Sequence, residues 1–193
     1  MQRLHTPQEA ARWLRQRVKG HLRTDSRQVH AGDAFLAWPG AQHDGRRFVP
    51  EVLARGAAAC LVEEGAWAGS EAFGATAPDA PLATYAQLKA ASGPIAAAYH
   101  EHPSHELDVL AVTGTNGKTS TAWWLAQALT RLGQRCAVAG TLGLGEIEQD
   151  AHGRVAVAGM ETGLTTPDAV LWQACLRDLA DRGVQACAVE ASS

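Results

Sequence analysis

A short glycine loop is the segment of this sequence best suited to chemistry. It reads Gly114-Thr115-Asn116-Gly117-Lys118-Thr119-Ser120 and lies between an apolar run and a stretch with helical periodicity. Glycines let backbone N–H groups turn toward an anion, and a following helix adds its N-terminal partial positive charge. Lys118 would then neutralise the β- and γ-phosphates of a nucleotide, while the Thr119 hydroxyl would help to hold Mg²⁺. The pattern predicts a phosphate-binding loop rather than a turn that only caps a helix.

The loop is shorter than the common phosphate-loop motif. That motif has four residues between its first glycine and the Gly-Lys pair. Here only Thr115 and Asn116 lie between them, and Val112 stands where the distal glycine would be. The compact form narrows the class of protein, although a nucleotide-binding module of another kind, such as a nucleotide switch or a small kinase, stays an alternative.

The segments around the loop predict a parallel sheet. Apolar runs that predict strands occupy residues 107–112, 136–139 and 186–189. Helices are predicted between them at 119–132 and 166–183, the second of them capped by Thr166-Pro167-Asp168. Strand, helix and strand in this order indicate βαβ connections and therefore a parallel sheet. The chain reaches Ser193 directly after the last strand, so we expect a truncated second domain with no C-terminal domain after it.

The first half of the chain predicts a smaller α/β unit. Thr6, Pro7 and Glu9 form a helix-start signature, and the helix should run to about Val18. Further strands are predicted at 22–24, 34–37 and 58–62, and further helices before Gly56 and up to about His100. Because His102-Pro103-Ser104-His105 interrupts the last helix, we place a domain boundary there, with domains at 1–104 and 105–193.

Composition limits the classes of partner. The net charge is −3 and the basic residues are scattered, which disfavours nucleic acid or an anionic membrane as the main partner. The four cysteines have no metal-ligand spacing and lie in apolar runs, so we expect buried, reduced thiols. The N-terminus lacks the apolar stretch of a signal peptide, which predicts a cytoplasmic protein.

Several motifs together resemble the Mur ligase family. The segment 112–121 resembles the ATP loop of Mur ligases and of folylpolyglutamate synthetase. Asp25-Ser26-Arg27, the segment 32–37, Gly40 and the segment 44–48 look like the UDP-binding domain of the muramyl ligases, which folylpolyglutamate synthetase lacks. Three later motifs are most similar to the family member that adds the third peptide residue: Gly140-Thr141-Leu142-Gly143, Leu164-Thr165-Thr166-Pro167 and Glu190-Ala191-Ser192-Ser193.

The resemblance implies an ATP-dependent amide ligase of peptidoglycan synthesis. The carboxylate of UDP-N-acetylmuramoyl-L-alanyl-D-glutamate would attack the γ-phosphate of ATP to give an acyl phosphate and ADP. The amine of an amino acid, meso-diaminopimelate or otherwise L-lysine, would then displace phosphate. ATP and Mg²⁺ would be required, and the enzyme would act as a monomer. Two alternatives stay open: the related ligase that adds D-alanyl-D-alanine, and a module that binds a UDP-sugar without catalysis.

The resemblance also implies roles for individual residues. Lys118 would be catalytic and residues 114–120 would bind ATP, while Thr119 and Glu190 would hold Mg²⁺. The residues that would bind the UDP-substrate are Thr24, Ser26, Ala41, Gln42, His43, Thr165, Thr166 and Ser192, the last three at its muramoyl-peptide end. Taken alone, Asp25-Ser26-Arg27 reads better as a solvated turn, and His43 as a surface histidine. A glutamate at a strand end such as Glu190 is also commonly only solvated.

Overall fold

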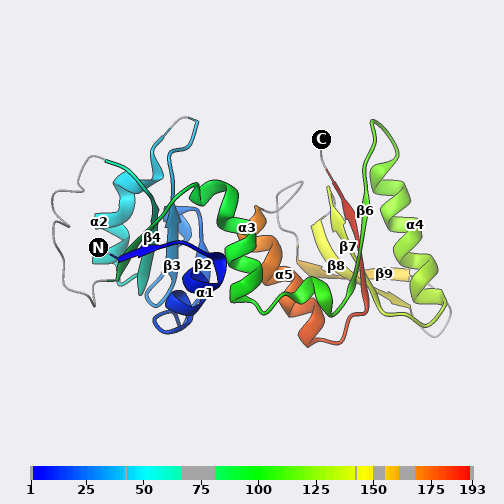
Figure 1. Cartoon of the computed structure of the whole chain (residues 1–193). Coiled ribbons are helices and arrows are strands. Elements are labelled where there is room, and N and C mark those ends of the chain that lie inside the picture. The colour runs from blue at the N-terminus through cyan, green and yellow to red at the C-terminus, as the bar shows by residue number, and fades with distance from the viewer. Residues whose placement is uncertain are drawn as a thin grey trace. The chain divides into compact units, whose positions relative to one another are not determined.

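The computed structural model describes residues 2–41, 43–66, 81–141, 143–149, 155–160 and 168–191. The chain divides into two compact units, which we call the first unit (Met1–Glu101 with Ala169–Leu171) and the second unit (His102–Asp168 with Trp172–Ser193). In each unit helices pack beside a five-stranded sheet (Figure 1). The predicted α/β fold class is confirmed.

The first unit contains a parallel sheet with strand order β1-β5-β4-β3-β2. Its strands are β1 (Gln2–Leu4), β2 (Leu22–Arg23), β3 (Ala34–Ala37), β4 (Ala59–Glu63) and β5 (Leu82–Tyr85). Its helices are α1 (Pro7–Arg15), α2 (Val49–Ala54) and α3 (Leu88–Tyr99), with short 3-10 turns η1 (Ser26–Gln28) and η2 (Gly45–Phe48). The sequence did not reveal the short strands β1 and β5.

Strand alternation divides the core of the first unit into two layers. Leu36 and Leu61 belong to a cluster with side chains of α1 and α3, whereas the alternate residues Phe35 and Cys60 pack with side chains of α2. Successive strand residues point to opposite faces of the sheet, so helices cover both faces. This two-sided burial is the usual condition of parallel sheets, and it leaves the strand ends as the part of the sheet open to a ligand.

Helix α1 begins as predicted and ends earlier. The Thr6 hydroxyl accepts from the Glu9 N–H, and the Glu9 carboxylate accepts from the Thr6 N–H, which completes a capping box. The helix ends at Arg15 rather than near Val18. Val18 lies just after the turn that follows the helix, and its side chain is buried there. The prediction was wrong because an apolar residue at this position continues the helical pattern of the sequence beyond the true end of the helix.

The second unit contains a mixed sheet with order β6-β10-β7-β8-β9. Its strands are β6 (Asp108–Val112), β7 (Cys136–Gly140), β8 (Gly143–Gln149), β9 (Val155–Met160) and β10 (Ala186–Glu190). Its helices are α4 (Lys118–Arg131) and the main part of α5 (Ala169–Asp181), with the 3-10 turn η4 (Pro103–His105) before them. Strands β6, β7 and β10 are parallel, as predicted. The structure adds their order, with β10 between the other two.

The antiparallel pair β8 and β9 was not predicted. Strand β8 begins Gly143-Leu144-Gly145-Glu146, and glycine and glutamate are weak strand formers. Strand β8 forms because it pairs with β7 and β9, although its own residues do not favour a strand. Helix α4 covers one face of this sheet, where Ala122 and Ala126 pack against side chains of β7, β8 and β10.

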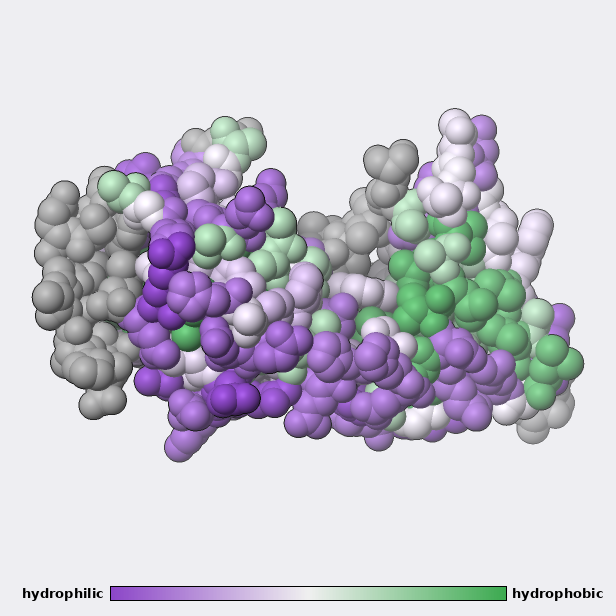
Figure 2. All heavy atoms as spheres, viewed as in Figure 1, coloured by the Kyte–Doolittle hydropathy of each residue, from purple (hydrophilic) through white to green (hydrophobic). Residues whose placement is uncertain are grey.

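The surface of the second unit carries apolar side chains. Figure 2 shows hydrophobic residues gathered on this unit in the view drawn. Large exposed hydrophobic residues in the described part of the chain are Val109 on the edge strand β6, Trp124 on α4 and Leu132 just after it. None of the described helices combines the length and apolar character needed to span a bilayer.

Candidate functional site

The glycine loop joins the end of β6 to the start of α4. Gly114 has φ 141° and Gly117 has φ 79°, in the range that favours glycine, and Gly117 is the residue directly before the helix. Residues 113–117 are exposed. The helix N-terminus and the exposed loop backbone form the arrangement in which N–H groups and the helix dipole attract phosphate.

Lys118 lies over this loop. As the first residue of α4 it is half-buried, and its Nζ donates a hydrogen bond of 2.8 Å to the Gly114 carbonyl oxygen. The contact brings the ammonium group back across the turn, beside the backbone that would surround a phosphate. A phosphate oxygen would compete with that carbonyl for the ammonium protons, and the charged acceptor forms the stronger hydrogen bond.

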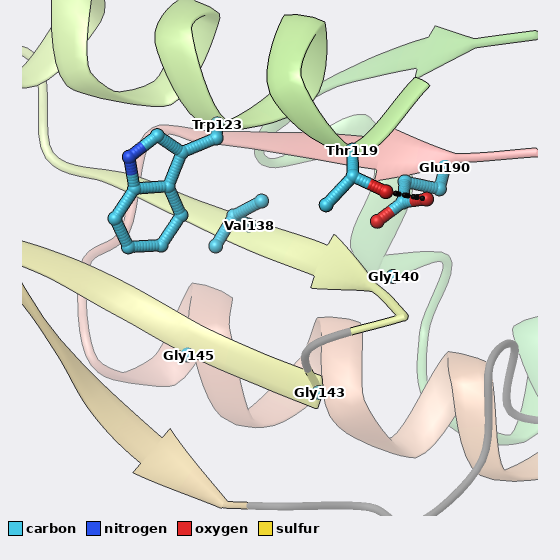
Figure 3. Close-up of a pocket in the computed structure, with 7 residues that line it drawn as sticks. All are labelled: Thr119, Trp123, Val138, Gly140, Gly143, Gly145 and Glu190. Atoms are coloured by element: carbon cyan, nitrogen blue, oxygen red, sulfur yellow. Dashed lines mark hydrogen bonds between the residues drawn. The ribbon is translucent and has the colours of Figure 1, made fainter. Parts of the chain in front are cut away.

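Thr119 contacts Glu190 at the bottom of the loop. The Thr119 Oγ1 donates to Glu190 Oε2 at 2.8 Å, although the two residues are far apart in the sequence. Sheet register explains the contact, because Glu190 pairs with Val112, the last residue of β6 before the loop. Figure 3 shows the two side chains facing each other at the ends of α4 and β10. Only 5% of Glu190 is exposed, so the carboxylate is a buried group rather than a solvated one.

This pair of groups fits a magnesium ion that also contacts nucleotide phosphates. A hydroxyl and a carboxylate are both oxygen ligands, and Mg²⁺ is usually bound by one or two protein oxygens together with phosphates and water. Across the described residues, no group of three or more His, Cys, Asp or Glu side chains could hold a metal ion by itself. The geometry therefore suits a cation that arrives with a nucleotide.

Thr141 is a neighbour of Glu190 to which the sequence assigned no role. Its N–H donates to Glu190 Oε1 at 3.0 Å, and its Oγ1 donates to Glu190 Oε2 at 3.2 Å. The residue follows β7, the strand that pairs with β10 on the side away from β6. The only sequence signal was its place in the Gly140-Thr141-Leu142-Gly143 motif, because nothing local indicates which carboxylate it meets.

A small cavity extends from Thr119 and Glu190 along α4. It has a volume of about 160 Å³, and Trp123 lies one helical turn beyond Thr119 on its wall (Figure 3). Glycines of β7 and β8 lie opposite the indole. The lining residues are Thr119, Trp123, Val138, Gly140, Gly143, Gly145 and Glu190. Apart from Thr119 and Glu190, the lining consists of glycines and the apolar side chains of Trp123 and Val138.

The residues predicted to bind UDP lie in the first unit. Thr24 and Ser26 follow β2, whereas Ala41 and His43 follow β3, and these two strands are parallel neighbours. The structure thus brings both segments to the carboxyl edge of one sheet, where ligands of open α/β sheets bind. Ala41 and His43 are exposed, and the His43 carbonyl accepts from the Gly40 N–H at 2.9 Å within a tight turn.

Two Asp-x-Arg turns shape this edge. Asp25 caps η1 and pairs with Arg27 through three side-chain hydrogen bonds, and Asp44 caps η2 and pairs with Arg46 in the same way. The arginine side chains lower the pKa of both aspartates through these hydrogen bonds, although burial opposes the effect. Each turn is therefore held by an ion pair of its own. The pair of Asp25 and Arg27 orders the backbone that carries Ser26.

Four predicted site residues lie outside the described part of the chain: Gln42, Thr165, Thr166 and Ser192. The other predicted residues form two groups, one in each unit. Thr24, Ser26, Ala41 and His43 belong to the first unit, and residues 114–120 with Glu190 belong to the second. Their roles stay predictions.

Comparisons with known proteins match both units. The model of the Mur ligase family catalytic domain matches residues 20–100, and that of the Mur ligase middle domain matches residues 112–193. The chain is 52% identical over 197 residues to the UDP-N-acetylmuramoyl-L-alanyl-D-glutamate--2,6-diaminopimelate ligase of Acidovorax sp. (strain JS42), covering 98% of this chain and 36% of that protein. It is 45% identical over 175 residues to the ligase of the same name from Janthinobacterium sp. (strain Marseille), covering 91% and 33%.

A solved structure of a ligase with this name is also similar to the chain. The structure of a UDP-N-acetylmuramoyl-L-alanyl-D-glutamate--2,6-diaminopimelate ligase superimposes with a TM-score of 0.63 at 28% identity, covering 89% of this chain and 31% of that one. The chain spans about a third of the length of the curated relatives it matches. Two adjoining family models, close relatives and the shared fold agree, and the chain belongs to the Mur ligase family.

Proposed function

We propose that this chain supplies the UDP-substrate-binding region and the ATP phosphate loop of a ligase that adds meso-diaminopimelate to UDP-N-acetylmuramoyl-L-alanyl-D-glutamate. The observation that carries the proposal is the Thr119–Glu190 hydrogen bond of 2.8 Å behind the glycine loop and Lys118. The names of the similar ligases support the choice of amino acid. The proposed enzyme is a monomer in the cytoplasm, where ATP and the nucleotide-linked substrate are available.

The proposed reaction is a phosphoryl transfer followed by an acyl transfer. The D-glutamyl carboxylate attacks the γ-phosphorus of ATP, which forms an acyl phosphate and releases ADP. The amine of diaminopimelate then attacks the acyl carbon and displaces inorganic phosphate, leaving an amide. No side-chain nucleophile is needed, so the protein acts by positioning and by charge stabilisation.

Each residue of the loop has a defined task in this scheme. The backbone of residues 114–117 surrounds the phosphates, and the Lys118 ammonium leaves the Gly114 carbonyl to offset the charge on the transferring phosphoryl group. Thr119 and Glu190 would hold Mg²⁺, which would supply further positive charge to the nucleotide phosphates. Ser120, the third residue of α4, follows Thr119 and completes the proposed ATP-binding set.

The UDP end of the substrate binds at the carboxyl edge of the first sheet in this proposal. Ser26 and Thr24 contact the diphosphate or uridine part, with residues 41–43 as the adjoining loop. Hydroxyl and backbone donors satisfy a diphosphate without a dense cationic patch. In this proposal Thr165, Thr166 and Ser192 hold the muramoyl-peptide end of the substrate.

Lys118→Ala tests the division of roles. We expect the variant to bind Mg·ATP roughly 10–100-fold more weakly, since a hydrogen bond to a charged group contributes about 1.5–3 kcal/mol. Affinity for the UDP-substrate should stay nearly unchanged, because Lys118 belongs to the phosphate loop and is not among the residues proposed to bind that substrate. Isothermal titration of the chain measures both affinities, and Lys89→Ala, an exposed lysine of α3, is the matched control.

Coupling is then assayed in a polypeptide of the relatives' full length that carries this chain. Wild type should join diaminopimelate to the UDP-muramoyl dipeptide in an ATP-dependent reaction, and Lys118→Ala should not. Equal loss of UDP-substrate binding in the variant would contradict the division of roles. Preferred coupling of L-lysine or D-alanyl-D-alanine would replace the proposed amino acid, and ATP hydrolysis that ignores UDP-muramoyl substrates would favour a nucleotide-binding module of another kind.

A further inference from the structure

We propose that Gly140 and Thr141 form a seat that fixes the Glu190 carboxylate, and that Thr141 is thereby a positioning residue for the contact between Thr119 and Mg²⁺. The inference rests on the proposed function and assigns a role to a motif that the phosphate loop leaves unexplained. Two observations support it: Glu190 packs closely on Gly140, and hydrogen-bond donors contact both oxygens of the Glu190 carboxylate.

Gly140 provides the space for the carboxylate. It is the last residue of β7, and Glu190 is the last residue of the neighbouring parallel strand β10. A Cβ atom built on Gly140 would overlap the Glu190 Cγ, Cδ and Oε1 atoms. Its φ is not in the left-handed range, so the requirement for glycine here comes from close approach and not from backbone conformation. Any larger residue must displace the carboxylate from its place beneath α4.

Thr141 provides the donors. Its N–H reaches Oε1 at 3.0 Å and its hydroxyl reaches Oε2 at 3.2 Å, so it contacts both oxygens of Glu190. The Thr119 hydroxyl, at 2.8 Å, adds a third hydrogen bond. A buried carboxylate held at both oxygens cannot rotate without losing hydrogen bonds that water does not readily replace.

The consequence for the cation follows from the chemistry of a hydroxyl group. A threonine hydroxyl has one proton and two lone pairs. When Glu190 accepts the Thr119 proton, the lone pairs of Thr119 Oγ1 are left free for Mg²⁺. Partners that orient the ligands of a metal in this way tune its affinity by about 10–100-fold.

Thr141→Val and Thr141→Ser separate positioning from shape. Valine keeps the backbone N–H and the size of the side chain, and it removes the hydroxyl, whereas serine keeps the hydroxyl. Each chain is titrated with Mn²⁺, a paramagnetic substitute for Mg²⁺, in the presence of a non-hydrolysable ATP analogue, and bound Mn²⁺ is counted by electron paramagnetic resonance. We expect Thr141→Val to weaken Mn²⁺ binding roughly 10–100-fold and Thr141→Ser to restore it to near the wild-type value.

Two further measurements exclude a general structural effect. The urea midpoint of Thr141→Val should fall only slightly, because the Thr141 N–H and the Thr119 hydroxyl still donate to Glu190. The control Thr130→Val removes a hydroxyl that donates to the Ala126 carbonyl within α4, and it should leave Mn²⁺ binding unchanged. Gly140→Ala should weaken Mn²⁺ binding at least as much as Thr141→Val, because it displaces the carboxylate itself.

The outcomes distinguish this inference from the proposed function. If wild type binds Mn²⁺ with the nucleotide and Thr141→Val binds it equally well, the seat has no influence on the cation and the inference fails while the proposed function stands. The inference also fails if Thr141→Ser is as weak as Thr141→Val, since shape would then matter and not the hydroxyl. If wild type shows no nucleotide-dependent Mn²⁺ binding, the proposed function fails and the inference with it.

Discussion

Ser26 lies in a turn whose shape does not depend on its own hydroxyl. The flanking residues Asp25 and Arg27 hold each other through hydrogen bonds of 2.6–3.1 Å, and the Asp25 side chain caps η1. The Ser26 carbonyl accepts from the Arg55 guanidinium. All these contacts use the backbone or neighbouring side chains, so the Ser26 hydroxyl can be removed while the turn that presents it is kept.

We therefore expect Ser26→Ala to change ligand binding without changing the fold. Loss of one hydrogen bond to a diphosphate should weaken binding of the UDP-substrate by about 1.5–3 kcal/mol and leave Mg·ATP binding unaltered. In a coupling assay KM for the UDP-substrate should rise with little change in kcat, as for a uniform binding contact. Ser104→Ala, an exposed serine in η4 of the second unit, is the matched control. An unchanged KM would return Ser26 to a solvated turn without a role.

The buried carboxylate of Glu146 links the second sheet to arginines that lie next to a strand and a helix. Glu146 lies in the middle of β8, opposite Ala137 of β7 and Ala158 of β9, and only 6% of it is exposed. Its oxygens accept from the Arg135 Nε at 2.7 Å and from the Arg182 Nη2 at 2.9 Å. Arg135 precedes β7 and Arg182 follows α5. The Glu146 side chain therefore connects strand β8 to the start of β7 and to the end of α5.

Glu146→Gln should destabilise this connection. The amide keeps the volume and loses the charge, so the hydrogen bonds to two guanidinium groups become weaker and a buried NH₂ meets two donors. We expect the free energy of unfolding of the second unit to fall by roughly 1.5–3 kcal/mol, measured by urea denaturation. Glu148→Gln, an exposed glutamate two residues along β8, provides the control and should change it by less than about 0.5 kcal/mol. Equal effects of both variants would show that the connection contributes nothing.

Local chemistry made much of the fold predictable. Gly114, Gly117 and Lys118 signal their conformation and charge by residue type alone, and the capping box of α1 is similarly local. The contact between Thr119 and Glu190 is different, because it depends on β10 pairing beside β6 rather than on either sequence neighbourhood. Resemblance to a family supplied that pair as a hypothesis, whereas the position of Glu190 at a strand end left a solvated glutamate as an alternative. Residues that act through long-range register, such as Thr141 and Glu146, had no local signal.

At the scale of the whole molecule, the buried thiols report on each unit separately. Cys60 lies in the core of the first unit, whereas Cys136, Cys175 and Cys187 belong to the second, and all four are free and buried. Burial raises the pKa of Cys60 and of Cys187 to about 12, and that of Cys136 to about 11. The thiolate is the reactive form, so each thiol should react with an alkylating reagent only when its surroundings open.

We predict that each ligand protects the thiols of its own unit. In urea below the unfolding midpoint, Mg·ATP at about 100 times its Kd should stabilise the second unit by about 2.7 kcal/mol and slow alkylation of Cys136 and Cys187 by roughly 100-fold. Cys60 should react at an unchanged rate, because it packs in a hydrophobic cluster of the first unit. UDP, the part of the substrate that is assigned to the first unit, should slow alkylation of Cys60 and leave the thiols of the second unit unaffected. Mass spectrometry of the alkylated peptides gives all these rates in one experiment. Equal protection of all four thiols by either ligand would show that the two units open as one cooperative body. If Mg·ATP protected Cys60 alone, the assignment of the nucleotide to the second unit would be wrong.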